Sequence, residues 1–315
     1  MKRHYLLAGS FAYDTVFQHP KAFSVSIKPG SIAKLNTSFQ LDSVVEAFGG
    51  CAANIGYNAA LLGDSPLLVG NLGEEDGDRY LRRIEGWGLD TSDIGMVADQ
   101  TTAHAWVLTD ANGNQITSFY AGAMTSSVDV PAAAPALWHI APEDPVNMVK
   151  LALEARARGA EYFFDPGQAL PTLLQGAAKH IASLEEVFAG AKGIFLNEYE
   201  CSLVAGNYPV NILSRPDQFL VRTRGSCGAD LVTQGDWIRV RPARPDSVVD
   251  PTGCGDAFRA GFLHGYVREK SLVECMSLGS VMGAVAVGSA GGQNHDVLRE
   301  ELYERWTAHL KTATY

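Results

Sequence analysis

The sequence predicts an α/β protein whose mostly parallel sheet is covered by helices on both faces. Short apolar strands without polar alternation are separated by helical stretches along most of the chain, a pattern typical of parallel strands buried on both faces. The 315 residues are 46% hydrophobic and 19% charged, which is ordinary for an enzyme with a large core. Two segments that interrupt this rhythm predict a second, smaller sheet.

The regular elements follow one another in a simple order. Strands are expected at residues 5–8, 67–70, 137–141, 161–165, 193–196 and 219–223. Helices are expected at residues 54–62, 78–87, 146–158, 184–189 and 257–268. Residues 229–240 predict a further hairpin. The apolar run at residues 5–8 is too short for the core of a signal peptide, so we interpret it as the first buried strand.

The two irregular segments both carry β-type patterning. Residues 23–47 mix polar and apolar side chains, and residues 102–120 alternate around Asn112-Gly113, a strong hairpin signal. We interpret them as a small sheet that stands off the body as a lid, although ordinary edge strands explain the pattern about equally well. The chain, residues 1–315, is expected to form a single domain with a discontinuous lid over roughly residues 15–47 and 100–122.

Charge and cysteine content limit the expected partners. The net charge is −10 without a basic stretch, which disfavours nucleic-acid binding. No run approaches the roughly 20 apolar residues of a membrane helix. The five cysteines are odd in number and have no C-x-x-C spacing. A disulfide framework or zinc site is therefore not expected, and a reducing cytoplasm is.

The most informative segment is residues 250–258, which read D-P-T-G-C-G-D-A-F. The two glycines and the carboxylate precede a helix whose first N–H groups have no internal partner. Gly253 and Gly255 allow close approach of a ligand, so the segment predicts an anion hole with Asp256 at its rim. Asp256 would then accept a proton from a hydroxyl that attacks a phosphate. The alternative is that Asp256 simply caps the helix.

Two segments in the first half of the chain suit a sugar-like ligand. Asp14 follows the first strand, where ligands of open α/β sheets bind, and its carboxylate could accept a vicinal diol. It could equally be a solvated loop residue. Residues 49–54 read G-G-C-A-A-N; they predict either tight helix packing or a surface against a polar ligand, with Asn54 donating to a hydroxyl.

Two segments in the second half suit a nucleotide. Asn197 and Glu200 lie three residues apart and could position Mg²⁺ through water, or could form a capping box. Residues 223–228 read T-R-G-S-C-G and predict either a loop over phosphates or a plain turn. The chain has no G-x-x-x-x-G-K-[ST] motif, and residues 253–255 lack the third glycine of a dinucleotide fingerprint, which argues against a P-loop or an NAD enzyme.

Considered together, residues 49–54 and 250–261 resemble the two signatures of the ribokinase family of carbohydrate and nucleoside kinases. The resemblance covers essentially the whole chain, and residues 9–14, 118–124, 165–168 and 250–261 look most like bacterial adenosine kinases. It implies a ribokinase-like three-layer α/β/α fold with a small β-sheet lid. It also implies ATP-dependent phosphotransfer to the 5′-hydroxyl of a ribonucleoside, foremost adenosine. The alternatives are a ribokinase or another sugar kinase, an inosine or guanosine kinase of this family, or a sensor that has lost catalysis.

The resemblance also implies roles for individual residues. Asp256 would be the base, beside an anion hole of Gly253, Cys254 and Gly255. Substrate would contact Ser10, Asp14, Gly49, Gly50, Asn54, Phe119 and Gln168. ATP would contact Asn197, Thr223, Gly225, Gly228, Gly291 and Asn294. Mg²⁺ would be organised through water by Asn197 and Glu200, and K⁺ would bind near Asp250 and Thr252.

Three further expectations concern specificity and assembly. Some relatives place an aromatic residue one position before Trp106, where this chain has Ala105, so the stacking of a nucleobase would differ. Arg259 would either pair with Asp256 or reach a phosphate. Lid sheets in this family sometimes pair, which would permit a homodimer.

Overall fold

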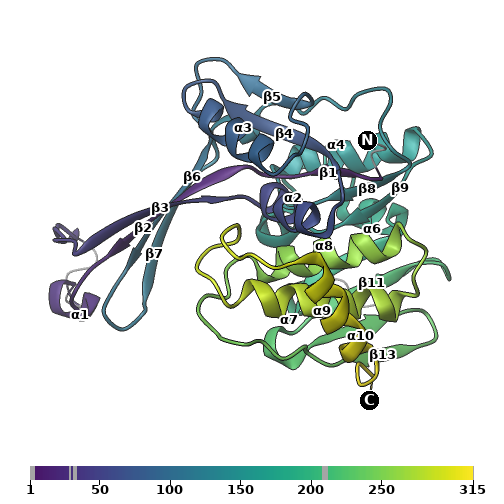
Figure 1. Cartoon of the computed structure of the whole chain (residues 1–315). Helices are drawn as coiled ribbons and strands as arrows, with labels where there is room; N and C mark the ends of the chain where they lie inside the picture. Colours follow the sequence, from purple (N-terminus) through teal and green to yellow (C-terminus); the bar gives the residue numbers. More distant parts are fainter. Residues whose placement is uncertain (1–3, 28–29, 31–33, 208–211, 315) are drawn as a thin grey trace.

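A central sheet of nine strands organises the described part of the chain, which in this computed structural model comprises residues 4–27, 30, 34–207 and 212–314 (Figure 1). The strands in spatial order are β13 (Trp237–Val240), β12 (Ala229–Val232), β11 (Phe219–Thr223), β10 (Gly193–Asn197), β9 (Glu161–Phe164), β8 (Leu137–Ile140), β1 (Leu6–Ala8), β4 (Leu67–Gly73) and β5 (Ile94–Val97). The pairs from β11 to β5 are parallel, and β12 and β13 add an antiparallel edge. The expected mostly parallel sheet is confirmed.

Helices cover both faces because successive strand residues point to opposite sides. Leu7, Phe163 and Phe195 pack into one core together with side chains of helices α2 (Cys51–Leu62) and α8 (Cys254–Tyr266). Leu6 and Phe164, their neighbours along the strands, pack into a second core with α4 (Pro145–Ala157) and α6 (Leu184–Gly190). The chain therefore has the expected three-layer α/β/α architecture, with the α8 layer on one face and the α4 layer on the other.

The helix boundaries follow local capping rules. The helices are α2 (Cys51–Leu62), α3 (Gly77–Gly86), α4 (Pro145–Ala157), α5 (Leu170–Leu174), α6 (Leu184–Gly190), α7 (Glu198–Asn207), α8 (Cys254–Tyr266), α9 (Leu272–Ala286) and α10 (Arg299–Leu310). Asp144 caps α4 by accepting from the N–H groups of Val146 and Asn147. Capping boxes start α6 and α9, where Ser183 and Ser271 accept from the N–H three residues on. No helix in the described part of the chain is long and apolar enough to cross a membrane.

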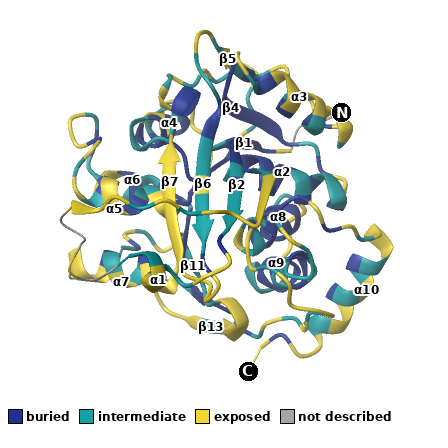
Figure 2. Ribbon diagram, turned by 90° about the vertical axis from the view of Figure 1, so that its left-hand side faces the viewer, coloured by how far each residue is buried: buried dark blue, intermediate teal, exposed yellow. Residues whose placement is uncertain are grey.

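A second sheet of four strands projects from the body (Figure 1). Its order is β3 (Ser43–Gly49), β2 (Ala12–Gln18), β6 (Ala103–Thr109) and β7 (Gln115–Tyr120). Figure 2 looks onto this sheet and shows that β7 is exposed along its length. The expected small sheet is confirmed, and the hairpin at Asn112-Gly113 joins β6 to β7. The single-domain assignment and the bounds of a lid stay predictions.

Two details of the small sheet differ from expectation. Asp14 was expected in a loop after the first strand, but it lies within β2, because Ala12–Gln18 pairs along its whole length with both β3 and β6. Continuous β structure over residues 23–47 is also wrong. Phe23–Ser26 form one helical turn, α1, in which the ring of Phe23 packs against His19 and Phe39. Within this segment, residues 28–29 and 31–33 lie outside the described part of the chain.

Candidate active site

The start of α8 is built by a glycine. Gly253 precedes the helix with φ 76°, a left-handed conformation that favours glycine. The helix begins at Cys254, earlier than the sequence suggested, and Asp256 therefore lies inside the first turn. The N-cap position makes no side-chain hydrogen bond. The alternative interpretation of Asp256 as the capping residue is wrong, and its carboxylate is free for another role.

The Asp256 carboxylate is partly buried and held by a neighbouring helix. Asn54 of α2 donates from Nδ2 to Asp256 Oδ2 at 2.8 Å. Burial raises the pKa of Asp256 to about 6, although Asn54, Arg259 and Cys51 favour the ionised form and Asp165 opposes it. A carboxylate that ionises near neutral pH can accept a proton from a hydroxyl. The arrangement therefore fits a general base.

The first turn of α8 also offers hydrogen-bond donors. The N–H of Cys254 bonds to Pro251 O, and that of Ala257 bonds to Gly253 O. Between them, the N–H groups of Gly255 and Asp256 belong to the helical turn that has no internal acceptors. A side chain at Gly255 would meet only Arg259 Nη1, at 3.2 Å from its Cβ. Gly255 thus fits an anion hole, as the sequence suggested.

Gly253 has a different neighbour from the expected ligand. A Cβ on Gly253 would lie 2.5 Å from the Cα of Gly292. A Cβ on Gly292 would in turn lie 2.7 Å from the Oδ1 of Asn54. The two glycines therefore let the 288–294 segment pack directly against the start of α8 and against Asn54.

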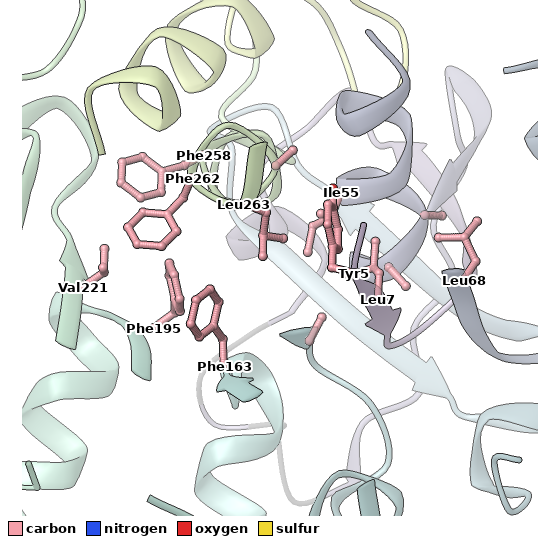
Figure 3. Packing of buried hydrophobic residues seen from close by; sticks show 14 of the residues in the cluster. Tyr5, Leu7, Ile55, Leu68, Phe163, Phe195, Val221, Phe258, Phe262 and Leu263 are labelled. Carbon is pink, nitrogen blue, oxygen red and sulfur yellow. The ribbon is translucent and has the colours of Figure 1, made fainter. Parts of the chain in front are cut away.

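Arg259 pairs with Asp165 and not with Asp256. Its guanidinium donates to the carboxylate of Asp165, which follows β9, from Nε at 2.5 Å and from Nη2 at 3.0 Å. Both side chains are buried, and the guanidinium lies over the ring of Phe195. Phe262 of α8 packs against Phe195 and Phe163 of the sheet, and Phe258 lies beside Phe262 in the same core (Figure 3). This packing fixes the helix that carries Asp256.

The start of α2 brings together several residues expected at the substrate. Gly50 caps the helix with φ 89°, and Ser10 Oγ accepts from the N–H of Cys51 at 3.1 Å. A Cβ on Gly49 would lie 2.9 Å from the Cγ of Asp14, so the Asp14 carboxylate rests on the Gly49 backbone. Burial raises the pKa of Asp14, while nearby His104 lowers it. The sequence segments at residues 10–14 and 49–54 are therefore adjacent.

Asp14 and Phe119 lie on one face of the small sheet. Asp14 pairs with Ala105 across β2 and β6, and Ala105 pairs with Phe119 across β6 and β7. Residues that pair across strands share a face, so a carboxylate, a methyl group and an exposed ring form one row. Trp106 points to the opposite face, where its ring stacks on His104 at 4.5 Å between centroids. Gln168 is exposed beyond the end of β9, and no contact in the structure joins it to this row.

Asn197 and Glu200 form the capping arrangement that the sequence left as an alternative. Asn197 Oδ1 accepts from the N–H of Glu200 at 2.8 Å, and Glu200 Oε2 accepts from the N–H of Asn197 at 2.7 Å. Asn197 Nδ2 also donates to Glu200 Oε1 at 2.8 Å. Each carboxylate oxygen retains a lone pair, so the pair fits Mg²⁺ only through its water ligands. Within the described residues, no cluster of His, Cys, Asp or Glu side chains could hold a metal ion directly.

The residues expected at ATP come from two loops. Thr223 pairs with Asn197 at the ends of β11 and β10, and the turn Gly225–Cys227 and Gly228 follow it. On the other side, Asp250 accepts from the N–H groups of Thr252 and Gly291, at 2.9 and 2.8 Å. These bonds join the 250–253 and 288–294 segments, and they lower the pKa of Asp250 although its burial opposes them. The side chain of Asn294 is engaged by Arg83 and by Ala290 O.

Four residues of the site were not found from the sequence. Asp165 was quoted only as part of a similar stretch, and Tyr80, Arg83 and Gln293 were not singled out. Tyr80 OH donates to Gly49 O and accepts from Gln293 Nε2, and Arg83 donates to Gln293 Oε1. Gln293 could have been found from the sequence, because it lies in a Gly-rich segment before His295. Tyr80 and Arg83 could not, because they lie on an ordinary amphipathic helix that carries no motif.

Comparison with known proteins agrees with this geometry. A family model described as pfkB family carbohydrate kinase matches residues 13–298, and the chain belongs to this family. It is an ATP-dependent kinase that transfers phosphate to an alcohol group. The chain is 30% identical to a nucleoside kinase of Methanothermobacter thermautotrophicus over 91% of this chain and 93% of the relative. It is 29% identical to a cytidine kinase of Thermococcus kodakarensis over 73% and 84%.

A solved structure gives the same result for the fold. The nucleoside kinase of Burkholderia thailandensis in complex with inosine superposes with a TM-score of 0.83 at 32% identity. The match covers 98% of this chain and 99% of that one. None of these three relatives is named an adenosine kinase, so the preference for adenosine remains to be tested.

Proposed function

We propose that this protein phosphorylates the 5′-hydroxyl of a ribonucleoside, with adenosine as the foremost substrate and Asp256 as the base. The observation that carries the proposal is the partly buried Asp256 carboxylate, 2.8 Å from Asn54 Nδ2 and beside the open first turn of α8. A carboxylate and free N–H groups at one point suit a reaction in which a hydroxyl loses a proton and a phosphoryl group gains negative charge.

In this mechanism Asp256 orients the acceptor hydroxyl and takes its proton as the bond to phosphorus forms. The N–H groups of Gly253 and Gly255, together with that of Asp256, would face the transferred phosphoryl group. The N–H of Cys254, which was expected to join them, is instead bonded to Pro251 O. The helix N-terminus favours the ionised form of Asp256. Asn197 and Glu200 would hold Mg²⁺ through its water ligands, and the ion would supply positive charge at the phosphates. K⁺ at Asp250 and Thr252 would act indirectly, through the loop that those residues join to Gly291.

The small sheet supports a nucleoside better than a free sugar. Neighbouring strands are about 4.8 Å apart, so Asp14 and Phe119 lie roughly 10 Å apart with only the methyl group of Ala105 between them. A ribose could donate its hydroxyls to Asp14 and to the backbone near Ser10, Gly49 and Gly50, and could accept from Asn54 Nδ2. A base could then lie against the exposed ring of Phe119, with Gln168 at its edge. The Burkholderia thailandensis nucleoside kinase was solved in complex with inosine, which supports a purine nucleoside as substrate of this chain.

The ATP side of the proposal uses the two loops already described. Thr223, Gly225 and Gly228 would follow the phosphates, and Gly291 and Asn294 would approach the adenine. The small sheet would close as a lid and exclude water from the phosphoryl transfer. Pairing of two such sheets would give a homodimer, since Val44, Val45, Ile116, Phe119 and Tyr120 are exposed on them.

The test is ADP release with Mg-ATP and each of adenosine, inosine, guanosine, cytidine, ribose and fructose 6-phosphate, with and without K⁺. We expect adenosine to give the highest kcat/KM. Preference for another nucleoside would correct the base specificity and keep the mechanism. Preference for ribose or the sugar phosphate would overturn the nucleoside assignment, and absence of turnover with every acceptor would favour a sensor.

A further inference from the structure

The side chain of Asn54 is held at both ends. Its Nδ2 donates to Asp256 Oδ2 at 2.8 Å, and its Oδ1 accepts from Gln293 Nε2 at 2.9 Å. An amide side chain can be turned by 180° with little change of shape, which exchanges its donor for its acceptor. The direction in which Asn54 points therefore depends on what Gln293 offers it.

The direction of Gln293 is itself determined by two neighbours on α3. Arg83 Nε donates to Gln293 Oε1 at 3.0 Å, and Arg83 Nη2 donates to the backbone O of Gln293 at 2.9 Å. A guanidinium can only donate, so Oε1 must face Arg83. The other end of the amide then donates to Tyr80 OH at 2.9 Å, whose own proton goes to Gly49 O. Both ends of Gln293 are therefore assigned without ambiguity.

Arg83 is held by packing as well as by hydrogen bonds. Its guanidinium lies 4.4 Å from the centroid of the Phe48 ring and 5.7 Å from that of Trp87. Phe48 belongs to β3 of the small sheet, and Trp87 follows α3. Cation–π contacts of this kind restrict the guanidinium to one position. The donor that orients Gln293 is thus fixed by two separate parts of the fold.

We propose that Arg83 and Gln293 are positioning residues that act through Asn54, forcing it to present its NH₂ group to the base. Each residue donates a hydrogen bond to the next: Arg83 to Gln293, Gln293 to Asn54, and Asn54 to Asp256. We call this series of bonds, in which each donor orients the next amide, the polarity chain. With Asn54 reversed, its Oδ1 would face the Asp256 carboxylate and two acceptors would meet without a proton between them. Such a contact disfavours the ionised base and displaces it. The catalytic consequence rests on the proposed role of Asp256.

The charged and titratable groups around Asp256 make this contact important. Cys51 faces it from α2, Arg259 from α8 and Asp165 from the end of β9. The positive charge of Arg259 is largely offset by the carboxylate of Asp165, to which it donates two hydrogen bonds. The Asn54 amide is therefore the principal neutral donor that favours ionisation of Asp256, and losing it should raise the pKa of that carboxyl.

The decisive variant is Gln293→Glu. A carboxylate at position 293 still accepts from Arg83 but has no proton to give, so Asn54 must turn its NH₂ group toward it. We expect the pKa of Asp256 to rise by about one unit or more, the effect of losing one hydrogen bond to a charged group. This can be measured by carbon-13 NMR of labelled Asp carboxyls, with Asp256→Asn giving the assignment. The acid limb of kcat/KM should move by the same amount, with KM for ATP changed less than about twofold.

Matched variants separate polarity from packing. Arg83→Lys retains a donor and should keep the limb near its original pH, whereas Arg83→Met should move it upward. Arg82→Met, at the exposed neighbouring position of α3, should change neither the pKa of Asp256 nor the acid limb of kcat/KM. Circular dichroism and the melting temperature would show that each variant is folded.

The outcomes distinguish this inference from the proposed function. An unchanged pKa of Asp256 in folded Gln293→Glu would overturn the polarity chain. A raised pKa with an unmoved acid limb would support the chain and instead contradict the role of Asp256 as base. A raised pKa with a limb that moves alongside it would support both.

Discussion

Arg259 donates two hydrogen bonds to Asp165, at 2.5 and 3.0 Å, although the carboxylate of Asp256 lies only one helical turn before it in α8. The pair joins the start of α8 to the end of β9 inside the core. It anchors the helix that carries Asp256, and the Asp165 carboxylate offsets the positive charge of the guanidinium near Asp256. The expected pairing of Arg259 with Asp256 is therefore wrong, and a contact of Arg259 with phosphate stays a prediction.

Breaking this pair should cost considerable stability. Arg259→Ala leaves Asp165 buried without its partner, and we expect a loss of about 3–5 kcal/mol in the free energy of unfolding. Urea denaturation would measure it. The control is Arg305→Ala, which breaks partly exposed pairs with Glu301 and Asp246 and should cost no more than about 1 kcal/mol. Equal losses in the two variants would show that the buried pair has no special role.

Removing the base should reduce turnover without removing the substrates. Asp256→Asn keeps the size of the side chain and can still accept from Asn54 Nδ2, but it cannot take a proton. We expect kcat to fall at least about 10²-fold, with the affinities for ATP and nucleoside retained in equilibrium binding. Near-normal turnover of the variant would rule out Asp256 as the base.

Activity should fall in weakly acidic solution. The Asp256 carboxyl has a pKa near 6, raised mainly by burial, and only its ionised form accepts a proton. We therefore expect kcat/KM to rise with pH up to about 6 and then to level off. The profile should be recorded between pH 5 and pH 8 with a saturating concentration of the second substrate. A limb near pH 4 would mean that the ionising group is not this carboxyl.

Asp256→Asn should also stabilise the folded protein at neutral pH. The pKa of Asp256 is about 6 in the folded state and near 3.8 as its ordinary value, so the folded protein holds the proton more tightly. Stability from this group is fully present below about pH 4 and is lost as the pH rises through 6. Asp256→Asn removes the buried charge, and at pH 7 we expect a gain of up to about 3 kcal/mol. Melting temperatures at pH 7 and pH 4 would show the gain at pH 7 and little difference at pH 4.

The ring of Phe119 should matter only for substrates that carry a base. Phe119→Ala removes the exposed ring in line with Asp14, and a stacking contact contributes about 0.5–1.5 kcal/mol. We expect KM for the preferred nucleoside to rise about 3- to 10-fold, with kinetics on ribose unchanged. Tyr120→Ala is the matched control, because Tyr120 pairs with His104 on the opposite face. Equal effects of both variants would contradict a base site at Phe119.

The fold was largely predictable because the pattern of apolar runs is local information. Buried strands such as Leu137–Ile140 and Gly193–Asn197 have no polar face, and this feature alone indicates a sheet covered on both sides. The hairpin at Asn112-Gly113 was equally plain. Asp14 was misplaced because β2 gains its strand conformation from pairing with β3 and β6, which lie far away in the chain.

The sequence by itself determined the α/β class, the glycine-flanked start of α8 and the carboxylate beside it, because helix ends and glycines follow short-range rules. Only the tertiary structure decided which groups surround that carboxylate. Asn54 reaches Asp256 across 202 residues of sequence, and Gln293 reaches Asn54 across 239. Such contacts depend on how helices and loops pack. In the proposed polarity chain, the direction of the hydrogen bond from Asn54 to Asp256 then depends on a donor as remote as Arg83. No spacing rule within the chain encodes that choice.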